Sequence, residues 1–157
     1  MKSILYIIAT AALCGAIMSC NKSTSQSSSR PLKEGIVGQL VWLEGNLMPT
    51  IDSDREIPKG QPVQREVLVY ELTKTKEAEK EGHFYHTIQT ELIQKVMSDK
   101  RGIFKLHLPP GKYSIFVKEP NGLFANIFDG YGNIMPVEVF KDEVTPITIE
   151  INYMAAY

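Results

Sequence analysis

The chain has 157 residues, 43% of them hydrophobic, with 17 basic and 18 acidic side chains and a formal net charge of −1. The length fits one domain with a short appendage. The balanced charge offers no basic field for a nucleic acid, and two cysteines and three histidines leave little material for a zinc site or a disulfide framework.

Residues 1–19 have the pattern of an export signal. Met1-Lys2-Ser3 gives a short positive start, and residues 4–18 form an apolar run interrupted by Thr10 and Gly15. A membrane-spanning helix needs about 20 apolar residues, so this run fits the core of a secretory signal peptide better. An uncleaved N-terminal anchor is the less favoured alternative.

The run ends in Ile17-Met18-Ser19-Cys20, which resembles the lipobox of bacterial lipoproteins. The resemblance implies cleavage after Ser19, diacylglyceryl attachment to the Cys20 sulfur, and acylation of the new amino group. It therefore implies a lipid-anchored protein of the bacterial outer membrane. The residues directly after Cys20 are not acidic, which favours the periplasmic face over the cell surface. Cys14 fits less well because the bulky Leu13 precedes it.

Residues 20–34 are expected to be the lipidated cysteine and a flexible tether. Residues 21–30 contain no aliphatic or aromatic side chain and are rich in serine, so they cannot bury enough surface to offset their ordering entropy. Once Cys14 is removed and Cys20 is alkylated, no thiol remains for catalysis or disulfides. The domain at 35–157 must then be stable through its core alone.

From Gly35 onward, short β-branched and aromatic runs alternate with turn residues. This pattern predicts an all-β fold, a single Greek-key-type β-sandwich of about seven strands. The expected strands are residues 36–43, 67–72, 88–96, 103–108, 112–118, 137–140 and 147–151.

Residues 73–82 are the one segment after Gly35 whose composition favours a helix over a strand. They are rich in Lys, Glu and Ala, which favour helices, but they lack an apolar stripe that would dock one. A solvated, mobile insertion that ends at Gly82 is the preferred interpretation, and a partner-binding helix is the alternative.

Three motifs carry a family resemblance. Residues 35–39 form a G-x-V-x-G-like opening strand, residues 98–106 a turn and strand, and residues 108–113 a Leu-Pro-Pro-Gly-Lys-Tyr hairpin. Together they resemble the carboxypeptidase regulatory-like domains, which implies a transthyretin-like (prealbumin-like) β-sandwich. The motifs match well from Gly35 to about Lys118. After Lys118, only the number of expected strands agrees with the family. Residues 73–97 and 121–133 are longer than that family's core requires.

The recognisable residues of these motifs have structural roles. Asp99 is suited to accept hydrogen bonds from the amides that follow it, and Gly102 is expected at positive φ. Tyr113 is expected to anchor one end of a sheet, with its hydroxyl hydrogen-bonded at the rim. None of them needs a catalytic explanation.

Two groups of residues resemble parts of metal sites, but neither is expected to bind a metal ion. On a helix His83 and His86 would share a face, but on a strand their odd spacing would place them on opposite faces, and no cysteine is available to join them. Residues 52–56, Asp-Ser-Asp-Arg-Glu, begin like a calcium loop but lack its glycine and later glutamate. No nucleophile, zinc-protease, phosphate-loop or dinucleotide motif occurs, so we expect neither a cofactor nor an enzyme.

The aromatic loop, residues 121–133, combines Phe124, Phe128 and Tyr131 with amides and glycines. These rings are candidates for stacking on a sugar or peptide. Because the alternation from Leu123 to Phe128 fits a strand, the favoured interpretation places Phe124 and Phe128 in the core and exposes Tyr131 alone. The sequence thus leaves two functions open. One is a non-enzymatic, lipid-anchored accessory or interaction module of the cell envelope, a monomer that meets an envelope protein or glycan. The other is a carbohydrate- or peptide-binding lipoprotein of an outer-membrane uptake system, which uses the aromatic loop at 121–133 as its site.

Overall fold

The computed structural model describes residues 31–48 and 60–157. The expected signal peptide, Cys20, most of the tether, and the acidic segment at 52–56 lie outside the described residues. The described part contains eleven strands and one short 3-10 helix, arranged as two sheets that pack together. The all-β sandwich class expected from the sequence is confirmed.

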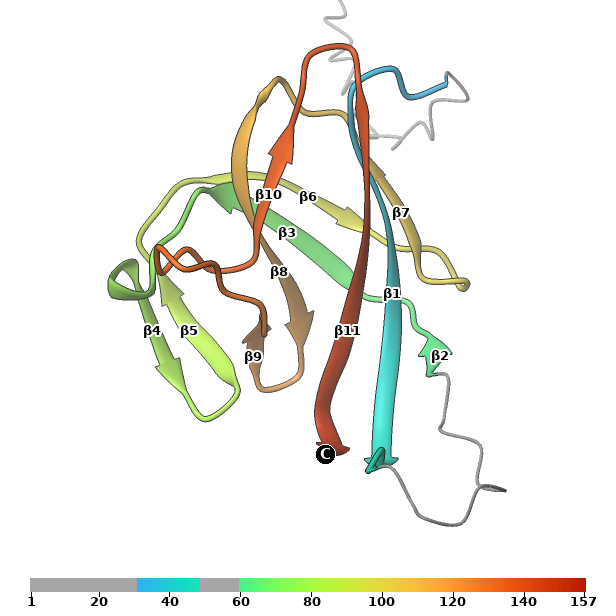
Figure 1. Cartoon of the computed structure of the whole chain (residues 1–157), viewed down its shortest axis with the longest axis vertical. Coiled ribbons are helices and arrows are strands. Elements are labelled where there is room, and N and C mark those ends of the chain that lie inside the picture. Colours follow the sequence, from blue (N-terminus) through green and yellow to red (C-terminus); the bar gives the residue numbers. More distant parts are fainter. Residues whose placement is uncertain (1–30, 49–59) are drawn as a thin grey trace, which may run out of the picture. The chain divides into compact units, whose positions relative to one another are not determined.

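The first sheet is built around β1 (Gly35–Asn46). β11 (Val144–Ala156) runs parallel to β1 along one edge, with Gly35 paired to Val144 and Asn46 to Ala156. The opposite edge of β1 pairs antiparallel with β7 (Ile103–Leu106) and β2 (Gln61–Pro62). Figure 1 shows β1 and β11 as the two longest strands, side by side. The beginning and the end of the domain are therefore joined in one sheet.

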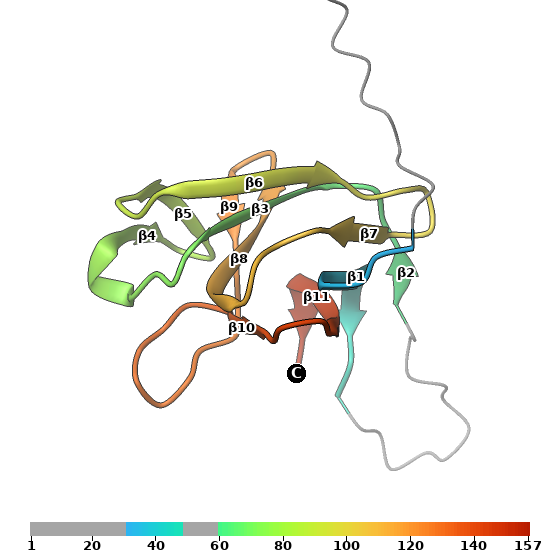
Figure 2. The same cartoon turned by 90° about the horizontal axis from the view of Figure 1, so that it is seen from above.

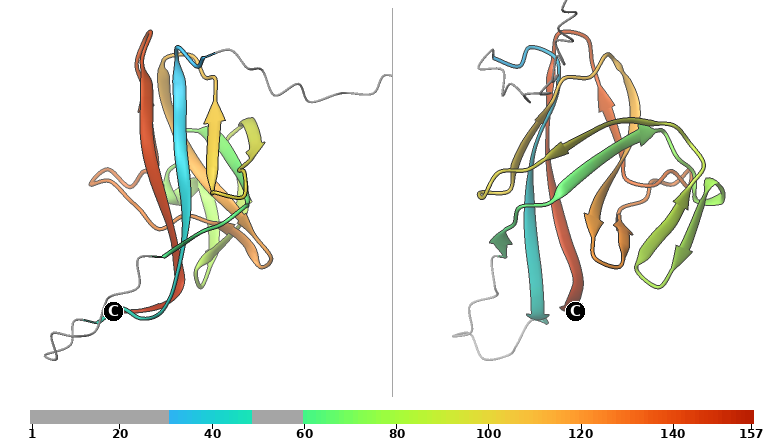
Figure 3. Two further views of the ribbon diagram at one scale, coloured as in Figure 1. Left: turned by 90° about the vertical axis from the view of Figure 1, so that its right-hand side faces the viewer. Right: turned by 180° about the vertical axis from the view of Figure 1, so that it is seen from behind.

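The second sheet has the strand order β4-β5-β9-β8-β3-β6, with β10 paired to β8. Its strands are β3 (Glu66–Glu71), β4 (Ala78–Glu81), β5 (Phe84–Ile88), β6 (Leu92–Met97), β8 (Gly111–Glu119), β9 (Gly122–Phe124) and β10 (Pro136–Val139). Figure 3 shows β1 and β11 in one layer and the strands of this sheet beside it.

The main core lies where the two sheets meet. Ile36 and Leu40 of β1 and Ile149 of β11 are fully buried, as are Val67 of β3 and Ile115 of β8. Alternating positions of each strand supply these side chains, as the pleat of a β-sheet requires.

β8 is covered on both faces. Tyr113, Ser114, Ile115, Phe116 and Val117 are all buried. The ring of Phe116 makes edge-on contacts with Tyr70 (5.5 Å between centroids) and Tyr85 (5.4 Å). Tyr70 lies on β3, which pairs with β8, and Tyr85 lies on β5, on the far side of β9. Rings from both sides therefore pack on Phe116, and β8 is central although it has polar Ser114 in its middle.

The turn before β7 has the expected geometry. Asp99 Oδ1 accepts hydrogen bonds from the backbone N–H of Arg101 (2.8 Å) and Ile103 (2.9 Å), and the N–H of Gly102 bonds to the Asp99 carbonyl (2.9 Å). Gly102 has φ +74°. At the next hairpin the Tyr113 hydroxyl donates to the Pro109 carbonyl at 2.9 Å, as predicted for the rim of a sheet.

The segment at 73–82 is neither a full helix nor a loose insertion. It contains a 3-10 turn, η1 (Thr75–Glu77), and then β4, which pairs antiparallel with β5. Gly82 takes φ +56° in the connecting turn, a conformation that suits a tight reversal. Pairing with β5 satisfies the backbone without an apolar stripe, so the charged side chains of β4 stay in solvent.

The single strand expected at 88–96 is two strands. β5 ends at Ile88 and β6 begins at Leu92, with a turn between them. The hydroxyls of Thr90 and Thr73 lie 2.6 Å apart, and the Glu71 N–H bonds to the Glu91 carbonyl at 3.0 Å. These contacts hold the turn against the end of β3, an interaction that strand periodicity alone does not reveal. Within residues 31–48 and 60–157, no helix is long and apolar enough to cross a membrane.

Candidate functional site

The three aromatic residues of the loop have different environments. Phe124, at the end of β9, is buried with 2% of its surface exposed, as expected. Phe128 is 43% exposed, so the expectation that it belongs to the core was wrong. β9 stops at Phe124, and the alternation that predicted burial of Phe128 does not continue as a strand. Tyr131 is 86% exposed.

Asp129 holds the part of the loop that presents Tyr131. Its Oδ1 accepts hydrogen bonds from the backbone N–H of Tyr131 and of Asn133, both at 2.9 Å, and its Oδ2 accepts the Asn133 side-chain amide at 2.6 Å. The side-chain hydrogen bond from Asn133 is the largest cause that lowers the pKa of Asp129 below its usual range. The loop thus has a defined local structure with an aromatic ring at its exposed apex.

A neighbouring segment fixes the base of this loop. The N–H of Thr75 bonds to the Gly132 carbonyl (3.0 Å), and the N–H of Ile134 bonds to the Thr73 carbonyl (2.9 Å). Thr73 is itself buried, and its N–H bonds to the Ser114 hydroxyl of β8 at 2.9 Å. The loop is therefore connected through Thr73 to the central strand of its sheet.

A cleft of about 310 Å³ lies beside Tyr131. Its walls come from the loop, from the start of β8 and from β10, where Lys112 and Glu138 form an ion pair at 3.6 Å. The cleft is lined by Leu72, Lys112, Asp129, Tyr131, Asn133, Pro136, Val137 and Glu138. Its polar and apolar groups could hold a small part of a larger ligand.

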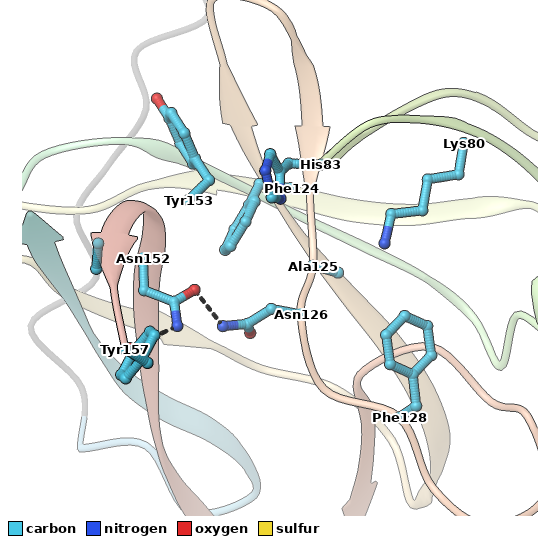
Figure 4. Close-up of a pocket in the computed structure, with 10 residues that line it drawn as sticks. Lys80, His83, Phe124, Ala125, Asn126, Phe128, Asn152, Tyr153 and Tyr157 are labelled. Atoms are coloured by element: carbon cyan, nitrogen blue, oxygen red, sulfur yellow. Dashed lines mark hydrogen bonds between the residues drawn. The ribbon is translucent and has the colours of Figure 1, made fainter. Parts of the chain in front are cut away.

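Phe128 lines a second cleft, of about 320 Å³, which shares no lining residue with the first (Figure 4). Lys80 of β4 lies with its Nζ 5.4 Å from the ring centroids of both Phe128 and Tyr85. At the far wall, the Asn126 amide donates to Asn152 Oδ1 at 2.8 Å. Phe128 and Tyr131 thus line separate clefts. The rings of Phe124, Phe128 and Tyr131 do not form one stacking surface.

The histidines do not gather into one site. His83 lines the cleft of Phe128 and lies 6.5 Å from the Tyr153 ring, between centroids. His86 Nε2 lies 3.7 Å from Glu81 Oε2 on the surface, and His107 Nδ1 lies 2.9 Å from the Glu34 carbonyl oxygen. In the described part of the chain, no three His, Cys, Asp or Glu side chains are arranged to hold a metal ion.

A buried charged group near these clefts is not predicted by any pattern in the sequence. Glu119, at the end of β8, has a fully buried side chain that accepts hydrogen bonds from Arg65 Nε and from the Tyr153 hydroxyl, both at 2.8 Å. Burial and this carboxylate raise the pKa of Tyr153 to about 12. Tyr153 also packs edge-on against Trp42 at 5.0 Å and Phe84 at 4.8 Å. The group links β11 to β8 and serves to hold the two sheets together.

The hydrogen bonds that the Asp129 carboxylate accepts could have been predicted from the sequence, because an Asp followed closely by glycines and an Asn is typical of Asx turns. The Glu119 network could not, because its three residues come together only through the sheet packing. Comparison with known proteins adds no relative: no family model and no curated protein matches this chain.

Proposed function

We propose that this chain is a non-enzymatic, lipid-anchored interaction module of the bacterial envelope, which binds an envelope protein through the loop that carries Tyr131. The observation that carries the proposal is the combination of an 86% exposed tyrosine with a loop held by three hydrogen bonds to the Asp129 carboxylate and by the bond from the Ile134 N–H to the Thr73 carbonyl. Exposed aromatic side chains on ordered loops are typical anchors of protein interfaces, because little conformational entropy is lost when they are buried.

The anchor belongs to the same proposal. The lipobox resemblance at Ile17–Cys20 supports attachment of lipid to Cys20, and the serine-rich tether would let the domain reach a partner near the membrane. The outer membrane, with the domain on its periplasmic side, is the location we propose.

The resemblance to the carboxypeptidase regulatory-like domains remains a proposal as well. It is supported by the turn that Asp99 and Gly102 form and by the Tyr113 hairpin, which adopt the local geometry that those motifs lead one to expect. Because these residues are occupied by turns, they support a scaffold role and not catalysis.

A carbohydrate- or peptide-binding role in uptake is the second candidate. It is favoured by the cleft of Phe128, where a 43% exposed ring lies close to the Lys80 ammonium and to the amides of Asn126 and Asn152. Exposed aromatic faces bordered by amides suit the apolar and hydroxyl surfaces of a sugar.

Co-purification from crosslinked envelopes tests the proposal. The full chain and its Tyr131→Ala variant would be isolated after mild formaldehyde treatment of intact cells, with Phe140→Ala as the control, because Phe140 is 51% exposed outside the loop. We expect one protein partner with the unsubstituted chain and the control, and its loss with Tyr131→Ala. A partner retained in all three would contradict the proposal. Binding of a glycan to the purified chain that is lost in a Phe128→Ala variant would favour the second candidate instead.

A further inference from the structure

The cleft of Phe128 holds a positive charge that no acidic side chain neutralises. Lys80 lies on β4, the edge strand at one end of the second sheet (Figure 2), and its Nζ is 5.4 Å from the ring centroids of Phe128 and Tyr85. Among residues 31–48 and 60–157, Lys80 takes part in no ion pair, and no Asp or Glu side chain lines the cleft. A second basic side chain, His83, does line it. The Lys80 ammonium is therefore available to an anionic ligand.

The other wall of the cleft carries a chain of hydrogen bonds between polar side chains (Figure 4). Asn126 Nδ2 donates to Asn152 Oδ1 at 2.8 Å, and Asn152 Nδ2 donates to the Tyr157 hydroxyl oxygen at 2.8 Å. Because the Tyr157 oxygen accepts this bond, its O–H remains free to donate to a ligand, and the side chain is 65% exposed. Asn152 keeps a second N–H and a second lone pair. This wall can therefore both donate to and accept from hydroxyl groups.

The ligand that fits this cleft combines a negative charge, an apolar face and several hydroxyls. The cleft volume of about 320 Å³ lies near the lower end of the usual range for ligand pockets and suits a single ring. A hexuronate, a sugar that bears a carboxylate, offers its C–H face to an aromatic ring and its carboxylate to an ammonium. A neutral hexose would leave Lys80 without a counter-ion. A peptide terminus is usually captured by backbone N–H groups, whereas Lys80, Asn152 and Tyr157 offer side-chain groups.

We therefore propose that the cleft of Phe128 binds a hexuronate residue of an acidic glycan. The carboxylate pairs with Lys80, the sugar ring lies against Phe128, and the hydroxyls bond to Asn152 and Tyr157. This inference rests on the second candidate function, to which it gives a chemical class of ligand. It does not depend on the Tyr131 loop, because the two clefts have no lining residue in common.

Titration of the isotope-labelled full chain with matched sugars, followed by NMR, tests the proposal. Galacturonate and glucuronate differ from galactose and glucose only in a carboxylate that replaces the terminal CH₂OH group. Both uronates should shift the amide signals of Lys80, Phe128 and Asn152 and leave that of Tyr131 in place. The neutral hexoses should bind at least about tenfold more weakly, the loss expected for one charge-assisted hydrogen bond.

Two variants and a control assign this preference to the cleft. Lys80→Gln keeps the length of the side chain and should bind uronates no better than hexoses. Lys105→Gln, which removes an exposed lysine from β7 in the other sheet, should bind like the unsubstituted chain. Phe128→Ala should weaken the binding of uronates and hexoses alike, because both place a ring against Phe128.

Three results would overturn the proposal. Equal binding of uronates and hexoses would leave the second candidate function standing but remove its acidic ligand. No shift at the cleft with any of the four sugars at millimolar concentration would end both. Triglycine, which offers a carboxylate without a sugar ring, should not bind there; if it binds as well as the uronates, the cleft is a site for peptide carboxylates. The comparison of sugars uses the unsubstituted chain, so it decides even if a variant does not fold, and none of these results bears on the Tyr131 loop.

Discussion

Asp129 is the residue on which the shape of the proposed binding loop depends. Its carboxylate receives the N–H groups of Tyr131 and Asn133 and the Asn133 side-chain amide. Asp129→Ala should therefore speed hydrogen exchange at the Tyr131 and Asn133 amides and leave the β8 amides unchanged. Asp129→Asn keeps an acceptor oxygen and should have a smaller effect. If hydrogen exchange at the Tyr131 and Asn133 amides is the same in Asp129→Ala as in the unsubstituted chain, the Asp129 hydrogen bonds do not order the loop.

The same carboxylate sets a pH dependence. Because the pKa of Asp129 is lowered in the folded chain, its hydrogen bonds stabilise the loop above the ordinary carboxyl pKa of about 4 and are lost as the pH falls through the lower folded value. Exchange of the Tyr131 amide, corrected for the intrinsic rate, should stay slow at pH 4 and rise only in stronger acid. A rise centred above pH 4 would contradict this assignment.

Glu119 carries the most buried charge in the described part of the chain. Replacing it with Ala leaves Arg65 and the Tyr153 hydroxyl without their acceptor, and we expect a loss of about 3 kcal/mol in the free energy of unfolding. Urea denaturation followed by circular dichroism measures this loss. Glu66→Ala is the control, because Glu66 pairs with Lys95 and Lys118 at a partly exposed site and should cost less than about 1 kcal/mol. Equal losses for the two variants would contradict a structural role for the buried pair.

At the scale of the element, the turn between β6 and β7 depends on Gly102. Its φ is +74°, and a Cβ atom there would lie 2.3 Å from the Leu40 carbonyl oxygen of β1. Gly82 has φ +56° but open space around it. Gly102→Ala should therefore cost about 3 kcal/mol in unfolding free energy, and Gly82→Ala only about 1 kcal/mol. Similar values for both would show that the contact with β1 is not tight.

Elements were predictable where the signal is local. The turn at Asp99–Gly102, the Tyr113 hairpin and the strands β1, β3, β7 and β8 follow from turn residues and β-branched runs. The β4–β5 hairpin was missed because its charged side chains favour helix locally, and pairing between strands overrides that preference. The prediction that Phe128 is buried assumed that the strand beginning near Leu123 continues to Phe128. β9 ends at Phe124, and the Phe128 side chain is exposed. The clefts, built from separate strands, leave no pattern in the sequence.

At the scale of the whole molecule, the account depends on attachment of the chain to a membrane at Cys20. The lipobox resemblance implies that Cys20→Ala blocks lipidation and leaves an unprocessed precursor. The unsubstituted chain should partition into the detergent phase of a Triton X-114 extraction, with an intact mass that includes the acyl groups. Cys14→Ala is the control and should be processed normally. A mature chain that begins at another residue and carries no lipid would contradict the anchor.

The main functional proposal is that the domain binds an envelope protein through the Tyr131 loop. It is tested most directly by placing the photo-crosslinking residue p-benzoylphenylalanine at position 131 of the full chain, illuminating intact cells, and repeating the experiment with the probe at position 140. Tyr131 and Phe140 are both exposed, but only Tyr131 lies on the braced loop. We expect a discrete adduct with one envelope protein at position 131 and none at position 140. Illumination that yields no adduct at 131, or the same adducts at both positions, would contradict it.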